Sequence, residues 1–452
     1  MLSKFKYKIH QQHLAKLPYI PQIAENFKTL YSPKDFRDAL MQAITFARNR
    51  IYLVILYLEY DHGGHQILEA LYQTKKNNPT LEVAVLVDWH RAQRGRIGTT
   101  ITSTNAEWYY WMATTHPNID VPIYGVPVNT REALGVMHLK GFIIDDQVIY
   151  SGASINNTYL HQLDQYRYDR YNMIKNQLLA DTLLSYIKQY LLAASAVNRL
   201  DDLERPKNIK IKHNIRLFRH LLKQSVYNYQ GNIATQNELS IIPLVGLGKK
   251  SLLNTTIHHL ICSTCDTLML CTPYFNLPTL LMRNLTVLLH LGKKIEIIVG
   301  DKIANDFYIP EDQPFQIISI LPYLYEINLR RFLERLQPYV SKGQLIVRLW
   351  KDGNNSYHLK GLWVDEKWQV LTGNNFNPRA WYLDLENALL IHDPQQRLRL
   401  QREQEQILIR THTQIVKHFT DLQSIADYPV KVRTLIRRLR RIRIDRLISR
   451  IL

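Results

Sequence analysis

Short hydrophobic runs alternate with longer amphipathic segments along the chain and predict its secondary structure. The β-branched runs LEVAVLVD, which ends at Asp88, and KIEIIVGD, which ends at Asp301, are typical of buried strands. Two further apolar runs, IYLVILYLEYD from Ile51 and TLMLCTPYFN from Thr267, each follow a segment with helical character. Strands that alternate with helices predict an α/β architecture.

These runs recur in the same order in both halves of the chain, which indicates an internal duplication. In each half the two strands precede a segment that contains HLKG, namely MHLKGFIIDD at 137–146 and YHLKGLWVDE at 357–366. Between the halves the sequence is rich in charged and polar residues and resembles a connector. We therefore predict similar α/β domains at 1–205 and 241–400, a connector at 206–240 and a helical C-terminal region at 401–452.

The length and composition favour a folded protein that does not cross a membrane. The chain has 452 residues, of which 46% are hydrophobic, so it can bury a large core. Its longest nearly continuous apolar run, residues 51–58, is far shorter than the roughly 20 residues that a spanning helix needs. The N-terminus has no continuous apolar core of the kind found in signal peptides. A cytoplasmic location is expected.

The three cysteines do not predict a metal site. Cys262, Cys265 and Cys271 lie in one short stretch, and no second cluster completes a zinc motif. We interpret Cys262 and Cys265 as small core residues in preference to a metal clip. The neighbouring His258 and His259 have no recognisable ligand spacing and are interpreted as packing or surface residues.

The net charge of +18 predicts an acidic partner, which could be nucleic acid, an anionic bilayer or a phosphate-bearing substrate. Residues 431–452 hold nine basic residues and one acidic residue, and their apolar positions fall close to one helical face. This pattern predicts a basic amphipathic helix that binds an anionic membrane surface. The alternative is a basic helix that packs on its own domain with the arginines in water.

The duplicated motif His-x-Lys-x-x-x-x-Asp carries the candidate chemistry. In a strand, the period of two places His138 with Lys140, and His358 with Lys360, on one face. A neutral imidazole is nucleophilic near pH 7, and a fixed ammonium offsets the charge of phosphate oxygens. Two copies allow one histidine to attack phosphorus while the other donates and accepts the proton. No metal is required by this scheme.

Polar residues after each motif complete the candidate site. A carboxylate bonded to the far nitrogen of a histidine fixes its tautomer, and Asp169 and Glu386 each stand at the start of an apolar run. Short polar side chains could donate to phosphate oxygens. The candidates for this role are Ser154, Asn156 and Asn375.

Other charged positions are assigned separately. The motif aspartates Asp145 and Asp365 have the opposite strand parity to the histidines and precede short polar turns, so we expect a structural role for them. The stretch DWHRAQRGR places three arginines just after a predicted strand, where α/β proteins usually bind ligands. Their guanidinium groups would suit a pyrophosphate, although a solvated basic loop explains the pattern equally well. These arginines are Arg91, Arg94 and Arg96.

The duplicated motif resembles that of the phospholipase D superfamily, and the half-repeats cover nearly the whole chain. Within it, VDWHRAQRGRIG, YGVPVNTREALGVMHLKGFIIDD, DKIANDFYIPED and the basic tail resemble the bacterial phosphatidylserine synthases. The resemblance implies two phospholipase D-type sandwich domains, each a mixed sheet flanked by helices, that form one shared active site. It also implies transfer of a phosphatidyl group from CDP-diacylglycerol to L-serine without a cofactor. The alternatives are a cardiolipin synthase, a phospholipase D or a nuclease of the same superfamily.

By position, the resemblance places His138, Lys140, Asp169, His358, Lys360 and Glu386 among the catalytic residues, with His138 as the nucleophile. It implies a peripheral enzyme on the inner face of the cytoplasmic membrane, with some non-specific attraction to ribosomes or other nucleic acid at low salt. The sequence departs from the Gly-Ser-x-Asn pattern of many relatives. It has GASIN in the first half, with Asn156 displaced by one residue, and GNN without serine in the second.

Overall fold

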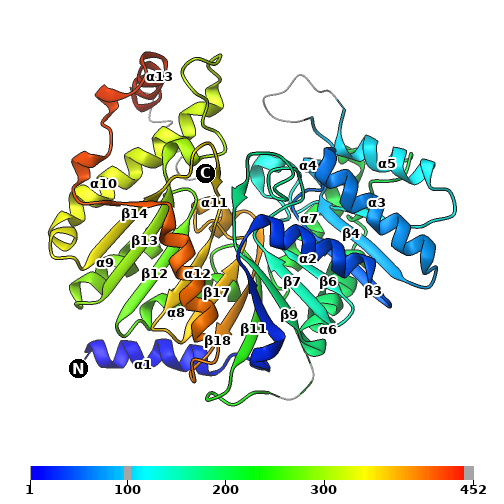
Figure 1. The fold of residues 1–452 in the computed structure, drawn as a ribbon, viewed down its shortest axis with the longest axis horizontal. Helices are drawn as coiled ribbons and strands as arrows, with labels where there is room; N and C mark the ends of the chain where they lie inside the picture. Colours follow the sequence, from blue (N-terminus) through cyan, green and yellow to red (C-terminus); the bar gives the residue numbers. More distant parts are fainter. Residues whose placement is uncertain (1, 96–102, 230, 232, 442–452) are drawn as a thin grey trace.

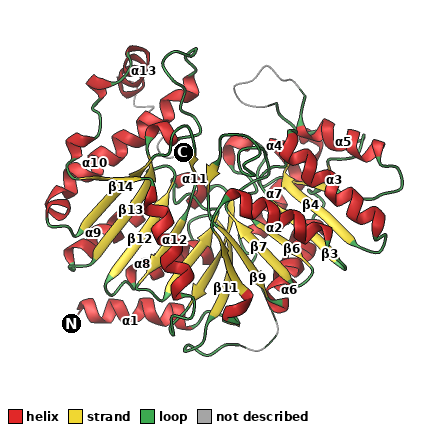
Figure 2. Cartoon of the chain, viewed as in Figure 1, coloured by secondary structure: helices red, strands yellow, loops and turns green. Residues whose placement is uncertain are grey.

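The computed structural model describes residues 2–95, 103–229, 231 and 233–441. Two large mixed sheets lie side by side, and helices cover their outer faces (Figures 1 and 2). This arrangement confirms the predicted fold class of two α/β halves with mixed sheets flanked by helices.

The first half forms an eight-stranded sheet. Its strands, in spatial order, are β10 (Asn198–Arg199), β5 (Ile123–Val126), β4 (Glu82–Asp88), β3 (Arg50–Val54), β6 (Gly141–Ile144), β7 (Gln147–Ser151), β9 (Tyr171–Lys175) and β2 (Phe27–Leu30). The pairs β3–β4 and β4–β5 are parallel, whereas β3–β6, β6–β7, β7–β9 and β9–β2 are antiparallel.

The second half forms a nine-stranded sheet. Its strands, in spatial order, are β1 (Ile20–Pro21), β11 (Ser240–Leu247), β18 (Leu385–His392), β17 (Trp368–Thr372), β16 (Gly361–Val364), β12 (Thr267–Thr272), β13 (Lys294–Gly300), β14 (Leu345–Trp350) and β19 (Thr413–Val416). The pairs β12–β13 and β13–β14 are parallel, and the remaining pairs are antiparallel.

The two sheets confirm the duplication. The run β5-β4-β3-β6-β7-β9-β2 of the first sheet matches the run β14-β13-β12-β16-β17-β18-β11 of the second in order and in strand direction. Both HLKG motifs therefore stand immediately before equivalent strands, β6 and β16. The strands predicted from the β-branched runs are β4 and β13, and each is buried over most of its length.

The described helices have the following bounds: α1 (Leu2–Ala15), α2 (Pro33–Thr45), α3 (His62–Asn77), α4 (Trp89–Ala92), α5 (Asn105–Thr115), α6 (Gln177–Tyr186), α7 (Asn208–Leu222), α8 (Leu252–Cys262), α9 (Thr279–His290), α10 (Leu321–Ser341), α11 (Pro378–Tyr382), α12 (Arg399–Thr411) and α13 (Val430–Arg441). Local sequence fixes several of their starts. Ser32, followed by a proline, caps α2, and Asp61 caps α3. Asp88, at the end of β4, caps α4.

The N-terminal segment packs on the second half although it precedes the first in sequence. Strand β1 pairs with β11, and helix α1 lies along α8 at the base of the second half (Figure 1). Leu14, Leu17 and Tyr19 are buried in the core of that half. The segment predicted as a connector, 206–240, contains α7. The domain boundaries given above stay a prediction.

The two halves share an apolar core. The cluster that fills the first half also contains Leu371, Leu385 and Leu389 from the second sheet. Because this surface is apolar and continuous, it holds the two sheets in a fixed relation. The HLKG motifs, at the starts of the central strands β6 and β16, are therefore held close to each other.

Two further expectations can be compared with the structure. No helix among the described residues is long and apolar enough to span a membrane. Of the cysteines, Cys271 is buried, Cys262 is half-buried and Cys265 is exposed. The interpretation of Cys265 as a core residue was therefore wrong, because the segment that carries it leaves the end of α8 at the surface.

Candidate active site

A short contact between the two halves places His138. Met137 forms a parallel bridge with Leu385 of the second half, and the backbone nitrogen of His138 donates to the Leu385 carbonyl at 2.9 Å. His138, which follows Met137, therefore lies opposite Glu386, which follows Leu385. Nδ1 of His138 lies 2.9 Å from Oε2 of Glu386, and both side chains are buried. This contact leaves Nε2 of His138 free for chemistry.

The second motif repeats the arrangement with the halves exchanged. Strands β15 (Ser356–Tyr357) and β8 (Arg167–Tyr168) pair in parallel, and Tyr357 stands opposite Tyr168. The residues that follow are His358 and Asp169, and Nδ1 of His358 lies 3.0 Å from Oδ2 of Asp169. Each half thus supplies the carboxyl group that orients the histidine of the other. The structure brings the two motifs together, as the sequence predicted for a shared site.

Both motif lysines are buried beside these pairs. Nζ of Lys140 donates to Oγ of Ser154 at 3.1 Å and to the Ala153 carbonyl at 3.3 Å. Nζ of Lys360 donates to Oδ2 of Asp169 at 3.1 Å and also contacts the His358 ring. Two ammonium groups thus flank the histidines on the face that the period of two predicted.

Two equivalent glycines let these side chains approach the backbone. A Cβ on Gly152 would lie 2.9 Å from Oδ2 of Asp169 and 3.2 Å from Nζ of Lys360. A Cβ on Gly373 would lie 2.9 Å from Cγ of Lys140. Contacts this short are not tolerated by real Cβ atoms, so a side chain at either glycine would displace a charged group of the site.

Burial favours the uncharged forms of the ionisable groups. It lowers the pKa of His138 well below its usual range, and Lys140 and Lys360 lower it further. Burial raises the pKa of Glu386 well above its usual range, and the second oxygen of this carboxyl group, Oε1, is buried without a hydrogen-bond partner among the described residues. The lowered pKa of His138 and the raised pKa of Glu386 therefore both favour uncharged partners in this contact.

Burial shifts the pKa values of His358 and Asp169 in the same directions as those of His138 and Glu386. Burial lowers the pKa of His358 well below its usual range, helped by the charge of Lys360, and burial raises the pKa of Asp169. The pKa of Lys140 falls to about 7, first through burial and then through repulsion by Lys360. A site in which imidazoles are neutral and lysines are crowded is suited to an anionic ligand, whose charge would relieve this repulsion.

Comparisons with known proteins identify the family of this chain. A family model described as "Cardiolipin synthase, PLD-like domain" matches residues 257–408. The CDP-diacylglycerol–serine O-phosphatidyltransferase of Escherichia coli is 64% identical over 452 residues and covers 100% of both chains. The chain belongs to the CDP-diacylglycerol–serine O-phosphatidyltransferase family. The Haemophilus influenzae member of this phosphatidyltransferase family is 49% identical, with 99% of each chain covered.

The fold agrees with that of a solved phosphatidyltransferase. The crystal structure of Haemophilus influenzae phosphatidylserine synthase superposes with a TM-score of 0.96 at 48% identity, and the match covers 98% of this chain and 99% of the other. The resemblance stated from the duplicated motif is therefore confirmed, and so is the sandwich fold that it implied.

The motif aspartates of this phosphatidyltransferase lie in turns away from the histidines. Asp145 accepts backbone hydrogen bonds from residues 48, 49 and 50 at 2.7–3.1 Å and so ties the β6–β7 turn to the start of β3. Asp365 accepts the equivalent bonds from residues 265, 266 and 267 at 2.5–3.0 Å. Both aspartates have positive φ, 52° in each case, as a tight turn between two strands requires.

The asparagines that could bind phosphate oxygens differ in whether their amide atoms already have hydrogen-bond partners. Both amide atoms of Asn156 are occupied, because Nδ2 donates to Oε2 of Glu59 at 3.0 Å and Oδ1 accepts from the backbone of Tyr159. By contrast, Nδ2 of Asn374, a donor, is buried without a partner among the described residues, as is Oδ1 of Asn375. Nδ2 of Asn374 is therefore freer than Asn156 to donate to a substrate oxygen, whereas Oδ1 of Asn375 can only accept a hydrogen bond.

The three arginines of the basic loop differ in what they contact. Arg94 forms a bidentate ion pair with Glu132, with distances of 2.6 and 2.9 Å. Arg91 lies over the ring of Tyr57 at 4.9 Å. Both line a pocket of about 120 Å³ beside Glu59. Arg96 lies outside the described residues. Because Arg94 is already neutralised by Glu132, Arg91 is the better candidate for an anionic ligand.

Sequence reasoning missed several residues that hold the second histidine. The Tyr159 hydroxyl lies 2.8 Å from Nδ1 of His358, and Arg167 packs over the Tyr159 ring. Arg167 also pairs with Asp306 at 2.9 Å, and Asp306 accepts a hydrogen bond from Tyr274 at 2.8 Å. These residues come from both halves and share no spacing. The only available signal was the cluster of aromatic and charged residues in YRYDRY, which also contains Asp169.

Proposed function

We propose that this chain transfers the phosphatidyl group of CDP-diacylglycerol to L-serine, giving phosphatidylserine and CMP. The observation that carries the proposal is the pair of buried histidines, each oriented by a carboxyl group from the opposite half, in a member of a family named for this reaction. His138 contacts its carboxyl partner through Nδ1, and His358 contacts Asp169 through Nδ1 and Lys360 and Tyr159 through Nε2. This arrangement supports an attack and a proton transfer at one phosphorus atom.

In the first step, Nε2 of His138 attacks the phosphorus that carries diacylglycerol. A nitrogen–phosphorus bond forms, and the bond from phosphorus to the CMP oxygen breaks. Protonated His358 gives its proton to that oxygen, so CMP leaves with a protonated phosphate oxygen. The diphosphate of the substrate, once it lies beside His358, favours the protonated ring that burial disfavours.

In the second step, neutral His358 takes the proton from the hydroxyl of serine. The serine oxygen attacks phosphorus, the nitrogen–phosphorus bond breaks and His138 is released. Lys140 and Lys360 offset the negative charge on the phosphate oxygens in both steps. Gly152 and Gly373 keep room for these lysines and for Asp169.

The assignment of His138 as nucleophile and His358 as acid and base is part of the proposal. Burial and the charges of Lys140 and Lys360 favour a neutral imidazole at His138. The ring of His358 is also influenced by the acidic Asp306, which opposes the downward shift of its pKa. This difference supports proton transfer by His358.

We also propose that the C-terminal helix contacts the anionic inner face of the cytoplasmic membrane. In α13, Val432 and Ile436 are buried against the second half, so this part of the apolar stripe packs on its own domain. Lys431, Arg437 and Arg438 are exposed. Residues 442–452 lie outside the described residues. The basic face would attract acidic lipids, and at low salt it could also attract ribosomes or other nucleic acid.

Product analysis tests the proposed function. The purified chain is incubated with CDP-diacylglycerol labelled in the phosphatidyl group, with or without L-serine, and in parallel with glycerol, with phosphatidylglycerol, or with plasmid DNA alone. We expect labelled phosphatidylserine and CMP only when serine is present. Label in phosphatidic acid or cardiolipin at comparable rates would favour the phospholipase or cardiolipin synthase alternatives, and nicked DNA would favour the nuclease.

The two histidines are tested in the same assay. His138→Ala and His358→Ala should each abolish transfer, because neither the attack nor the proton transfer can be supplied by the other half. His213→Ala, at an exposed position of α7, is the matched control and should retain full turnover. Near-normal turnover in either motif variant would refute the two-histidine mechanism.

A further inference from the structure

Four histidines and a cysteine gather between helices α1 and α8, away from the catalytic motifs. Ring centroids of His10 and His13 lie 4.1–5.6 Å from those of His258 and His259, and Cys262 ends α8 beside them. The apolar packing of α1 on the second half brings these groups together. The chain has 17 histidines, so four of them in one contact call for an explanation.

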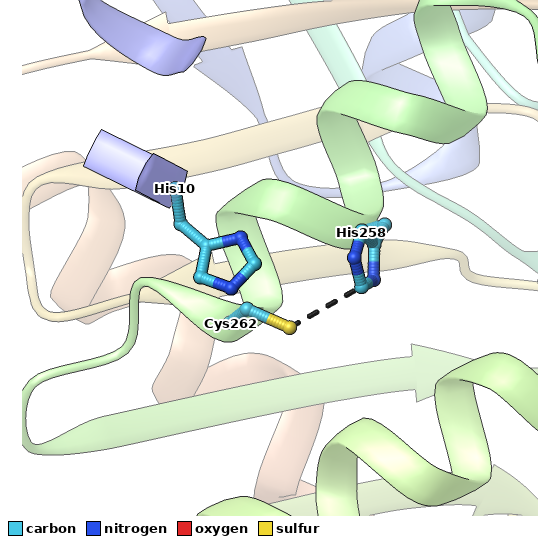
Figure 3. Close-up of side chains that lie close together, drawn as sticks. All are labelled: His10, His258 and Cys262. Carbon is cyan, nitrogen blue, oxygen red and sulfur yellow. Dashed lines mark hydrogen bonds between the residues drawn. The ribbon is translucent and has the colours of Figure 1, made fainter. Parts of the chain in front are cut away.

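Three of these residues have the geometry of metal ligands. The ligand atoms of His10, His258 and Cys262 all lie within 4.8 Å of one another. His258 and Cys262 are four residues apart and share one face of α8, with Sγ 3.7 Å from Nδ1. Figure 3 shows the three side chains converging from the two helices. Ligands of a tetrahedral Zn²⁺ are about 3.3–3.8 Å apart, so shifts of roughly 1 Å would close the site.

Hydrogen bonds from neighbouring side chains fix the rings of this cluster. The Asn284 amide nitrogen lies 2.8 Å from Nδ1 of His258, and Nδ1 of His10 lies 2.8 Å from Nδ1 of His259. These contacts hold both rings beside Cys262, and an ion that bound either Nδ1 atom would take the place of the contact at that atom.

We propose that His10, His258 and Cys262 form a site for a single Zn²⁺ ion, with water at the fourth position. Two imidazoles and one thiolate match the ligand preferences of zinc. The ion would fasten the N-terminal helix to the second half, because one ligand comes from α1 and two from α8. This inference departs from the expectation of no metal site and goes beyond the proposed transfer reaction.

The site is separate from the catalytic pairs. Among the described residues, the side-chain hydrogen bonds of the four histidines and Cys262 run to Thr256, to Asn284 and to one another, and none reaches a catalytic residue. The ion is therefore assigned to the attachment of α1 and to no step of phosphatidyl transfer. Removal of the ion should leave turnover at low temperature unchanged and should weaken the attachment of α1 to the second half.

Cobalt titration tests the ligand set directly. The untagged full chain is stripped with a chelator and titrated with Co²⁺, which gives a thiolate-to-metal charge-transfer band when a cysteine binds it. We expect saturation at one Co²⁺ per chain and displacement by Zn²⁺. Cys262→Ser should lose the band, and His10→Gln or His258→Gln should weaken binding at least about tenfold. No band in the intact chain would overturn the site.

Two matched variants control for other thiols and imidazoles. Cys265→Ser removes the exposed thiol three positions along, and His213→Gln removes an exposed histidine of α7. Both should titrate like the intact chain. Loss of the band in Cys265→Ser with retention in Cys262→Ser would show that the assigned ligands are wrong.

Protease protection tests the proposed role of the ion. Cleavage in the segment between α1 and β1, residues 16–19, should be slower with Zn²⁺ than after chelation, and Cys262→Ser should not respond to zinc. The melting temperature should rise with Zn²⁺ in the intact chain and in Cys265→Ser but not in Cys262→Ser. Equal protection with and without zinc would refute the fastening role.

Discussion

Replacement of Glu386 by glutamine separates the catalytic from the structural role of the carboxyl group. Nδ1 of His138 lies 2.9 Å from Oε2 of Glu386, and burial raises the pKa of this carboxyl group, so an amide of the same shape can keep a hydrogen bond to the uncharged ring. Attack on phosphorus places positive charge on the His138 ring, and the carboxylate form of Glu386 can balance that charge. An amide cannot. Glu386→Gln should therefore bind substrate normally and react slowly.

The magnitude follows from the geometry. The 2.9 Å contact places the carboxylate and imidazolium charge centres about 4 Å apart, and at an effective dielectric near 20 their attraction is about 4 kcal/mol. This corresponds to a fall in kcat of roughly a thousandfold if the whole interaction is lost. Solvent and Lys140 would compensate in part, so we expect a loss of about 10²–10³-fold with KM nearly unchanged.

The Glu386→Gln variant should lose activity without losing thermal stability. Because the pKa of Glu386 is raised in the folded state, the carboxyl group destabilises the fold as pH rises past its unfolded value, and glutamine removes this cost. The melting temperature at pH 8 should therefore be unchanged or higher, while kcat falls. Glu403→Gln, at an exposed position of α12, is the control for loss of a charge. Wild-type kcat in Glu386→Gln, or a parallel loss of activity and melting temperature, would refute the reasoning.

Three further predictions address other parts of the account. Gly152→Ala should lower kcat by up to about 100-fold, because its Cβ displaces Asp169 and Lys360, while circular dichroism melts shift little; full activity would contradict the close approach. The value of kcat/KM should fall as pH rises above about 7, since Lys140 then loses its charge in the free enzyme, and a flat profile to pH 9 would contradict this. Neutralising Arg437 and Arg438 together to glutamine should weaken sedimentation with anionic vesicles about 30-fold, since each charge contributes about 1 kcal/mol, whereas salt-independent binding would refute the membrane role.

Much of the fold could be predicted because its signals are local. The β-branched runs that became β4 and β13 needed only their own sequence to indicate buried strands. The duplication needed only the order of the runs. Helix α7 within the predicted connector was missed because its apolar positions, such as Ile215 and Phe218, are embedded in a strongly basic segment.

The sequence predicted the parts of the site that lie within each repeated motif. It did not predict the contacts between the two halves. The strand period placed each histidine beside its lysine, and the position of Asp169 and Glu386 before apolar runs suggested carboxyl partners. Which carboxyl group serves which histidine depends on the bridge between Met137 and Leu385, a contact that no sequence pattern encodes. The Arg94 ion pair with Glu132 is another such contact, and it occupies one of the three arginines for which pyrophosphate binding and a solvated loop were equal alternatives.

The histidine and cysteine cluster shows the same limit more sharply. His258 and Cys262 have helical spacing, but His10 approaches them only because α1 folds back onto the second half. A metal motif split between the N-terminus and the middle of a chain has no recognisable spacing. His10 reaches the other two ligands only if α1 packs on the second half, and apolar residues such as Leu14 determine this packing.

Chemical trapping of the intermediate tests the central claim most directly. The chain is mixed with CDP-diacylglycerol labelled in the phosphatidyl phosphate, without serine, quenched in alkaline denaturant and digested, and the labelled peptide is mapped. We predict label on the peptide that contains His138, and its loss to phosphatidylserine when serine is added before the quench. Label on the His358 peptide would reverse the assigned roles. No protein-bound label during turnover, with His138→Ala still active, would contradict a covalent histidine mechanism.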